Sequence, residues 1–222
     1  MRPPGLVIFD CDGVLVDSEP IALEILLDTL AAAGLPMEAE AASERFLGRS
    51  LQSTVDILAE EFGLELDDAS LAAMRARLYA AFRAGLRPIE GVAETVDALP
   101  CRSCVASSSQ PERIELSLRV AGLWPRFEGR VFSATMVARG KPAPDLFLHA
   151  AGAMGFAPPD CLVVEDSPAG VQAAQAGGMR VVGFVGGGHA QGAAHRAALA
   201  ALEPERVIDD MRALIGIGWG GD

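Results

Sequence analysis

The sequence has little positive charge. Lysine and arginine together number 18 against 30 aspartates and glutamates, which gives a formal net charge of −12 at pH 7. A chain this acidic repels the backbone of nucleic acids and the surface of anionic membranes, so we expect neither as a partner. It also repels small phosphorylated molecules, unless a local group reverses the sign of the charge where they bind.

Long apolar runs are also missing. No stretch reaches the ~20 apolar residues of a membrane-spanning helix. The first residues, "MRPPGLVIF", lack the shape of a signal peptide, because their short apolar run leads directly into acids. We therefore expect a cytoplasmic protein, either a monomer or a homodimer. With 222 residues, half of them hydrophobic, the chain is long enough for one substantial core and a smaller second lobe.

Cysteine and histidine are scarce, with four and three residues. Cys101 and Cys104 form a C-x-x-C motif, but a zinc site needs a second pair at matching spacing, which the sequence lacks. A thioredoxin-like pair opens a helix, whereas "CRSCVAS" leads into a predicted strand. We therefore expect the cysteines to act as small hydrophobes. The histidines, His149, His189 and His195, are scattered along the chain, and we assign none of them a catalytic role.

What the sequence does contain is a series of short apolar segments rich in valine and isoleucine. Continuous apolar runs are typical of strands that are buried on both faces of a parallel sheet. Helical periodicity lies between most of these segments. The alternation predicts an α/β fold with a doubly wound, Rossmann-like parallel sheet. The predicted strands are 6–9, 103–106, 131–132, 162–165, 181–184 and 207–208, and the predicted helices between the later strands are 111–121, 145–154 and 169–176.

One long gap interrupts this alternation between the first two strands. Residues 19–86 contain successive apolar stripes at helical spacing, the first with Ser18 as its predicted N-cap and Gly34 as its end. We therefore predict a small helical cap domain, residues 15–89, inserted into an α/β core formed by residues 1–14 and 90–222. Its hinges are predicted near residues 14–17 and 87–91.

Polar residues gather where the predicted strands end. In a parallel α/β sheet, ligands bind at the carboxyl ends of the strands, so four polar clusters on one edge indicate a functional site. In chain order the clusters are Asp10 with Asp12, the serines Ser107, Ser108 and Ser109, Lys141 in "GKPAPD", and Glu165 with Asp166 in "VVEDSPAG".

The first cluster is a pair of aspartates separated by one residue. Side chains two apart in an extended chain point to the same side, so Asp10 and Asp12 project into one site. Asp166 adds to their repulsion, which a divalent cation relieves, and hard carboxylate oxygens suit Mg²⁺. We predict that the side chains of Asp10 and Asp166 hold the cation, with a backbone carbonyl near Asp12. The Asp12 side chain then remains available as a general acid and base beside an ionised nucleophile.

Lys141 is the only lysine in the chain. A compact ammonium differs chemically from a planar guanidinium, so a site that needs a point charge resists replacement by arginine. We predict that Lys141 faces a phosphate oxygen and the carboxylate of the nucleophile. Ser107 is predicted to donate a hydrogen bond to the same phosphate, with further donors from the backbone N–H groups that follow it.

These stretches together resemble the four motifs of the haloacid dehalogenase-like hydrolase superfamily. The motifs are "FDCDGVLVDSE", "VASSS", "GKPAPD" and "VVEDSPAG", and their order and spacing match along essentially the whole chain. The helical insertion resembles the small cap of the subgroup that contains beta-phosphoglucomutase, phosphoglycolate phosphatase and sugar-phosphate phosphatases.

The resemblance implies a role for each matching residue. Asp10 is the nucleophile that takes the phosphoryl group, and Asp12 protonates the leaving alkoxide and then activates water. Mg²⁺, a lysine and backbone amides together reverse the negative field locally, so that an acidic protein accepts an anion. The implied binding residues are Ser107, Ser108 and Lys141 for the phosphoryl oxygens, and Asp10, Asp12, Glu165 and Asp166 for the metal.

Other activities of the superfamily fit this sequence less well. Dehalogenases lack the second acid, which is present here as Asp12, and phosphonatases need a lysine in the cap, which contains none. Beta-phosphoglucomutases usually carry an arginine in a cap pattern like G-x-S-R. Here "GRSLQS" places Leu51 at that position and Arg49 two residues earlier, and Gln110 stands where a mutase tends to have lysine.

We therefore expect a Mg²⁺-dependent phosphatase that hydrolyses a small phosphorylated metabolite, a sugar or sugar-acid phosphate, through an aspartyl-phosphate intermediate. Arg45 or Arg49 of the cap is expected to contact the distal end of the substrate. Two alternatives stay open: a mutase of the beta-phosphoglucomutase type, and a non-catalytic protein that binds a phosphate ligand.

Overall fold

The computed structural model describes residues 3–46, 49, 51–190 and 193–216. Its centre is a six-stranded parallel sheet in the order β3-β2-β1-β4-β5-β6. β1 lies between β2 and β4, and all of its residues are buried, which explains its unbroken apolar sequence. The strands are β1 (Leu6–Phe9), β2 (Arg102–Ser107), β3 (Val131–Ser133), β4 (Cys161–Glu165), β5 (Arg180–Phe184) and β6 (Arg206–Ile208).

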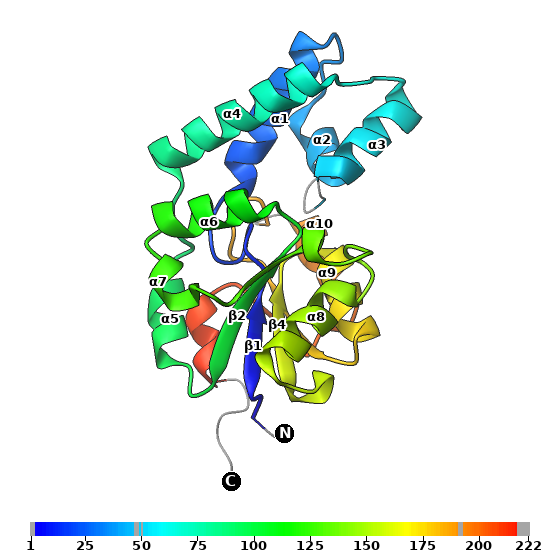
Figure 1. The fold of residues 1–222 in the computed structure, drawn as a ribbon. Helices are drawn as coiled ribbons and strands as arrows, with labels where there is room; N and C mark the ends of the chain where they lie inside the picture. Colours follow the sequence, from blue (N-terminus) through cyan, green and yellow to red (C-terminus); the bar gives the residue numbers. More distant parts are fainter. Residues whose placement is uncertain (1–2, 47–48, 50, 191–192, 217–222) are drawn as a thin grey trace.

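Helices cover both faces of this sheet (Figure 1). Alternate residues of β1 serve the two faces, because Val7 and Phe9 pack into one apolar cluster while Leu6 and Ile8 pack into the other. The predicted doubly wound α/β fold is thereby confirmed. The first face is covered by α5 (Val92–Ala98), α6 (Pro111–Val120), α7 (Trp124–Phe127) and the 3₁₀ segment η3 (Met211–Gly216), and the second by α8 (Asp145–Met154), α9 (Pro168–Ala176) and α10 (Ala193–Ala200).

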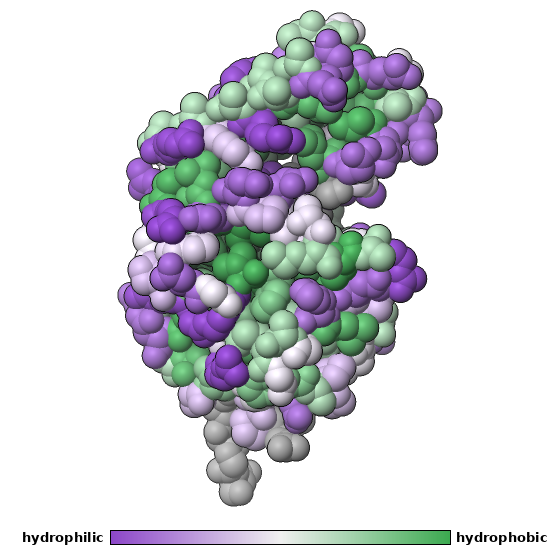
Figure 2. Space-filling model, viewed as in Figure 1, coloured by the Kyte–Doolittle hydropathy of each residue, from purple (hydrophilic) through white to green (hydrophobic). Residues whose placement is uncertain are grey.

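The helical insertion is the group of helices between β1 and α5, namely α1 (Glu19–Ala32), α2 (Ala39–Phe46), α3 (Leu51–Phe62) and α4 (Asp68–Gly85). It has a small apolar cluster of its own, formed by Leu30, Ala42, Phe46 and Leu58. The helices lie together beyond one end of the sheet in Figure 1, and Figure 2 shows the surface hollowed between them and the core. Within the described residues, no helix is long and apolar enough to cross a membrane.

The two connections to the helical insertion lie side by side. The backbone N–H of Asp17 donates to the carbonyl of Arg87 (3.0 Å), and the N–H of Ile89 donates to the carbonyl of Leu15 (3.0 Å). These connections are the segments predicted as hinges. The chain therefore enters and leaves the helical insertion at one place, close to the carboxyl end of β1.

The start of α1 differs from the prediction. Ser18 precedes the helix but makes no capping hydrogen bond, because its hydroxyl donates to the carboxylate of Asp12 (2.6 Å). The end agrees with the prediction, since Gly34 follows the helix with a φ of +85°, a conformation that glycine adopts without strain. The hydrogen bond from Ser18 therefore connects the start of α1 to Asp12 of the predicted active site.

Candidate active site

The predicted site residues from three strands meet at the carboxyl end of the sheet. Asp10 directly follows β1, Ser107 ends β2, and Glu165 and Asp166 lie at the end of β4. All four are buried. The central position of β1 places Asp10 between the other two strand ends, where its N–H donates to the carbonyl of Val164 (3.0 Å).

Lys141 reaches this group from the loop that precedes α8, and its side chain is 4% exposed. Its ammonium donates to Asp10 Oδ1 (2.5 Å), to Glu165 Oε1 and to the carbonyl of Ala106 (3.3 Å). Burial alone lowers the pKa of Lys141, but the charges of Asp10 and Glu165 outweigh burial and raise it above its usual value. Lys141 is therefore a lasting positive charge among buried acids.

Asp10 and Asp166 are buried close to other acidic side chains. Burial raises the pKa of Asp10 well above its usual range; Lys141 opposes that rise, and Glu165 and Asp166 add to it. Burial, followed by repulsion from Glu165, likewise raises the pKa of Asp166. A hard divalent cation stabilises the ionised form of acids in such a place, and carboxylate oxygens are the donors that Mg²⁺ prefers. The chemistry of Asp10 and Asp166 therefore fits Mg²⁺.

Glu165 does not fit its predicted role as a metal ligand. Its Oε1 accepts a hydrogen bond from Lys141, and its Oε2 accepts from the N–H (3.0 Å) and the hydroxyl (2.9 Å) of Ser167. Both oxygens are thus engaged, which makes Glu165 a partner of Lys141. In the part of the chain that the structure describes, no three His, Cys, Asp or Glu side chains are arranged as a metal cluster.

Asp12 lies in a different environment from Asp10. Its Oδ1 accepts hydrogen bonds from Ser18 Oγ (2.6 Å) and Arg113 Nη2 (2.8 Å), and its Oδ2 accepts from Ser109 Oγ (2.6 Å). Burial raises the pKa of Asp12, but Arg113 and the two hydroxyls outweigh burial and lower it below its usual value. The two aspartates of one motif are therefore chemically unequal.

Glycine is required at two points where acids approach the backbone. Gly13 has a φ of +79°, and a Cβ there would lie 2.0 Å from Asp166 Oδ2. A Cβ at Gly170 would lie 1.9 Å from the carboxyl group of Glu165. Any larger residue would push Asp166 or Glu165 out of the site.

Two histidines that have no predicted role, His189 and His195, lie against Asp166. His189 is 3% exposed, and its Nε2 lies 2.8 Å from Asp166 Oδ2, although neither ring nitrogen makes a well-aligned hydrogen bond. His195 Nε2 lies 2.7 Å from the carbonyl oxygen of Asp166. The two rings meet edge to face, with centroids 5.4 Å apart. No spacing in the sequence links either histidine to Asp166, so the pattern gave no signal for them.

The predicted serines differ in exposure. Ser107 is buried, and its hydroxyl accepts a hydrogen bond from the N–H of Ser109 (3.1 Å). Ser108 is partly exposed. The turn after β2 therefore directs the hydroxyl of Ser109 to Asp12, while Ser107 stabilises the turn itself.

The structure does not bring Arg45 to the acids at the sheet. Its guanidinium pairs with Glu61 and lies over the ring of Phe62, 5.4 Å from the centroid, so its contacts are within the helical insertion. Arg49 is exposed between α2 and α3. A contact between either arginine and a substrate remains a prediction.

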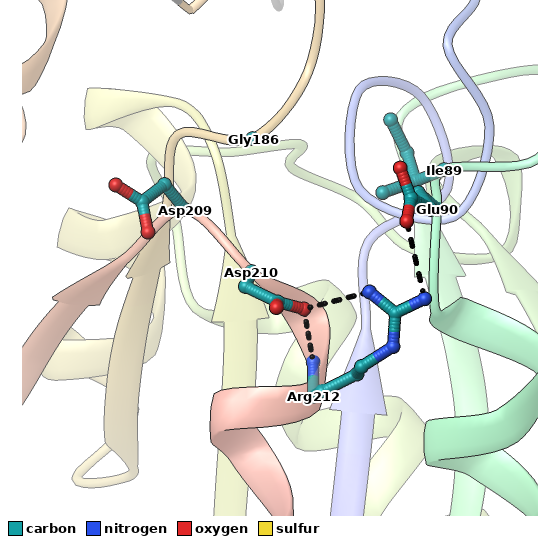
Figure 3. Close-up of a pocket in the computed structure, with 6 residues that line it drawn as sticks. All are labelled: Ile89, Glu90, Gly186, Asp209, Asp210 and Arg212. Carbon is teal, nitrogen blue, oxygen red and sulfur yellow. Dashed lines mark hydrogen bonds and ion pairs between the residues drawn. The ribbon is translucent and has the colours of Figure 1, made fainter.

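A separate cavity of about 240 Å³ lies beside the second connection (Figure 3). It contains none of the predicted site residues. Arg212 crosses it and pairs with Glu90 (3.2 Å) and Asp210 (3.4 Å), so this cavity is a polar seam between the connection and η3. Its lining residues are Ile89, Glu90, Gly186, Asp209, Asp210 and Arg212.

Comparison with known sequences gives a consistent result. A family model for haloacid dehalogenase-like hydrolases matches residues 4–178, which contain all the site residues predicted from the sequence. The chain is 33% identical to 6-phosphogluconate phosphatase of Escherichia coli (strain K12) over 184 residues, which cover 82% of this chain and 83% of that protein.

Solved structures agree over nearly the whole chain. A conserved haloacid dehalogenase-like protein of unknown function from Agrobacterium tumefaciens str. C58 has a TM-score of 0.83 and 36% identity, and the match covers 96% of both chains. A HAD family hydrolase from Deinococcus radiodurans R1, solved with bound phosphate and sodium, has a TM-score of 0.76 and 34% identity, covering 96% of this chain and 94% of that one.

Proposed function

This chain belongs to the haloacid dehalogenase-like hydrolase family, and from that premise we propose that it removes phosphate from a small sugar or sugar-acid phosphate. The family and its phosphatase relatives make it a phosphoric monoester hydrolase. The proposal adds the substrate class, a dependence on Mg²⁺ and a covalent intermediate on Asp10. The observation that carries it is the buried contact between Lys141 and Asp10.

Phosphate binding follows from the charges at the end of the sheet. Lys141 supplies a fixed positive charge beside Asp10, and the hydroxyl and N–H groups around Ser107 and Ser108 supply neutral donors. When Mg²⁺ is bound, the side chains of Asp10 and Asp166 and a backbone carbonyl near Asp12 would hold it, and its chemistry is to neutralise the phosphoryl oxygens. A chain of net charge −12 can then accept an anion at this place.

The first half of the reaction transfers the phosphoryl group to the protein. A carboxylate oxygen of Asp10 forms a bond to phosphorus as the bond between phosphorus and the leaving oxygen breaks. Asp12, which is ionised in the free protein and must first take up a proton in the complex with substrate, gives that proton to the leaving oxygen, so the product leaves as an alcohol. Lys141 favours the ionised form of Asp10 that attacks, and its contact with Glu165 holds Lys141 in place.

The second half restores the enzyme. Asp12, now ionised, takes a proton from a water molecule, whose oxygen attacks the phosphorus of the aspartyl-phosphate. The bond between phosphorus and Asp10 breaks, and inorganic phosphate leaves. The hydrogen bonds that Asp12 accepts from Ser109 and Arg113 fit its ionised form.

The helical insertion is proposed to act as the cap that closes over the substrate, with the domain boundaries at residues 15 and 89. The adjacent connections and the hollow between the two parts support this assignment. Arg49 and, after release from Glu61, Arg45 are the basic residues that would meet the distal end of an acidic substrate.

The test is phosphate release from a panel of phosphate esters: 6-phosphogluconate, several sugar phosphates and phosphoglycolate. Each is measured with Mg²⁺ and with EDTA, for the wild type and Asp10→Asn. We expect Mg²⁺-dependent release that Asp10→Asn abolishes. If beta-glucose 1-phosphate is converted to glucose 6-phosphate instead, the protein is a mutase. If neither reaction occurs, the non-catalytic alternative replaces the phosphatase.

A further inference from the structure

Arg113 is a mostly buried arginine in the first turns of α6, and the proposed reaction gives it no chemical step. Its side chain is 22% exposed, and Nη2 donates to Asp12 Oδ1 at 2.8 Å. Its Nε is buried without a hydrogen-bond partner. The guanidinium also lies over the ring of Phe82, 5.4 Å from the centroid. Arg113 therefore joins Asp12 to the C-terminal part of α4.

Phe82 is well placed to fix the plane of this guanidinium. It is fully buried and packs in the apolar cluster of the sheet, although it belongs to α4 of the helical insertion. A guanidinium stacks on an aromatic face, and its donors form a rigid planar fork. The contact with Phe82 limits the rotation of the guanidinium, and therefore the directions in which Nη2 can donate to Asp12.

The carboxylate of Asp12 is held from three parts of the chain. Ser18 donates from the start of α1, Ser109 from the turn after β2, and Arg113 from α6. An ionised carboxylate offers about four acceptor positions. The three donors therefore leave roughly one position of the Asp12 carboxylate free. Two of the three contacts depend on the helical insertion, Ser18 directly and Arg113 through Phe82.

We propose that Arg113 is a positioning residue for proton transfer: it orients Asp12 toward the leaving oxygen and ties that orientation to α4. The inference rests on the proposed function, because it requires Asp12 to act as the general acid. Ion pairs as buried as this one add little to stability by themselves, since desolvation offsets most of the attraction. Orientation is the effect that the planar fork and the contact with the ring of Phe82 supply.

The test uses the leaving group as the readout. An alkoxide needs a proton to leave, whereas p-nitrophenolate leaves without one, so only the first depends on a well-placed acid. We expect Arg113→Gln to lower kcat/KM for the best alkyl phosphate by about tenfold or more, and for p-nitrophenyl phosphate by less than about threefold. Arg113→Lys keeps the charge without the fork and should give an intermediate, equally selective loss.

Two further variants separate positioning from a general loss of structure. In an Asp12→Asn background, Arg113→Gln should cause no further loss with the alkyl phosphate, because the residue through which it acts is already disabled. Phe82→Leu keeps Arg113 but removes the aromatic ring that it contacts. It should also lower kcat/KM more for the alkyl phosphate than for p-nitrophenyl phosphate, but by less than Arg113→Gln does. Arg119→Gln is the matched control, because Arg119 lies on the same helix and pairs with exposed Glu115. It should leave kcat/KM unchanged for both substrates.

The outcomes distinguish failure of the positioning role of Arg113 from failure of the proposed function. Equal losses with both substrates, or a further loss in the Asp12→Asn background, overturn the positioning role and leave the proposed function standing. Hydrolysis of no phosphate ester by the wild type, or full activity of Asp10→Asn, overturns the proposed function and the inference with it. Thermal unfolding of every variant checks that the protein tested is folded.

Discussion

The sheet and the helical insertion use charge and packing in opposite ways. At the end of the sheet, charged groups are buried and paired, as in the contact of Lys141 with Asp10. In the helical insertion, ion pairs such as Arg45 with Glu61 lie on the surface, about half exposed. Its own apolar cluster has four buried members in the described residues, whereas each cluster of the sheet is several times larger.

This difference agrees with the two proposed roles, phosphoryl transfer at the end of the sheet and substrate selection by the helical insertion. Reacting groups need fixed distances, and buried partners in a parallel sheet supply them. A loosely packed group of helices with surface charges is less constrained, and it suits a part that contacts substrates of different shapes. Substitutions at the end of the sheet should therefore change activity, whereas substitutions in the apolar cluster of Leu30, Ala42, Phe46 and Leu58 should change stability.

The largest expected effect is at Lys141. Lys141→Met leaves Asp10 and Glu165 as neighbouring buried acids and removes the charge for phosphate, so kcat/KM for the best substrate should fall by about 10²–10³. Lys141→Arg should recover only part of this loss, because the fork does not fit a point-charge position. Steady-state kinetics measure both, with Arg139→Gln, an exposed pair with Asp145, as the control. Activity within a few-fold of the wild type would contradict the assignment.

The next effect is on packing in the helical insertion. Leu58 is fully buried in the small cluster, and Leu58→Ala should reduce the free energy of unfolding by about 2–4 kcal/mol. Urea denaturation measures the change, and p-nitrophenyl phosphate hydrolysis in the absence of urea should stay close to the wild type. Leu148→Ala, at a side chain that is 40% exposed, is the control. A large loss of p-nitrophenyl phosphate hydrolysis in folded Leu58→Ala would contradict the expectation that this cluster affects stability and not activity.

A smaller effect is expected at the junction of the two parts. Burial, followed by repulsion from Asp12, raises the pKa of Glu19 from 4.5 to about 7. The folded state thus holds this proton more tightly than the unfolded state, so the wild type loses stability as pH rises from about 4.5 to 7. Glu19→Gln removes that loss and should be more stable above pH 7, by on the order of 2 kcal/mol.

Urea midpoints at pH 5 and pH 8 test this expectation. The advantage of Glu19→Gln should grow between the two values, while Glu24→Gln, an exposed site on the same helix, should show no such trend. A constant difference between the wild type and Glu19→Gln at both pH values would mean that Glu19 does not titrate in this range.

The smallest effect is a helix cap in the helical insertion. The carboxylate of Asp67 accepts a hydrogen bond from the N–H of Ser70 (2.8 Å) at the start of α4. Asp67→Ala should reduce stability by about 1 kcal/mol and leave kcat/KM unchanged. Thermal unfolding and kinetics check both halves, with Asp68→Ala as the adjacent control. A change in activity without a change in stability would show that the charge at this position matters to the substrate.

The sequence was most informative about features that follow from strand burial and parallel strand direction. The apolar run before Asp10 is buried on both faces, so it had to be an inner strand, and parallel strands bring their carboxyl ends to one edge. That rule alone places Asp10, Ser107 and Asp166 together. The single lysine was also visible, because its rarity made one position stand out.

Contacts that depend on side-chain reach were not predictable in the same way. Arg113 lies 101 positions from Asp12, and the contact depends on how far its side chain reaches from the start of α6, the helix that follows β2. His189 and His195 reach Asp166 from beyond β5, a segment without a recognisable motif. The place of Glu165 beside Asp166 suggested a metal ligand, and nothing in the sequence indicated that Lys141 and Ser167 would donate to its two oxygens.

The hydrogen bond between Asp17 and Arg87 makes the start and end of the helical insertion neighbours in space. A segment whose ends meet can be lengthened, shortened or exchanged without moving any strand of the sheet. Recombination between relatives could thus replace the whole proposed cap in one event and leave the end of the sheet unchanged. For protein engineering, the same junction is a natural point at which to graft a foreign cap onto this core.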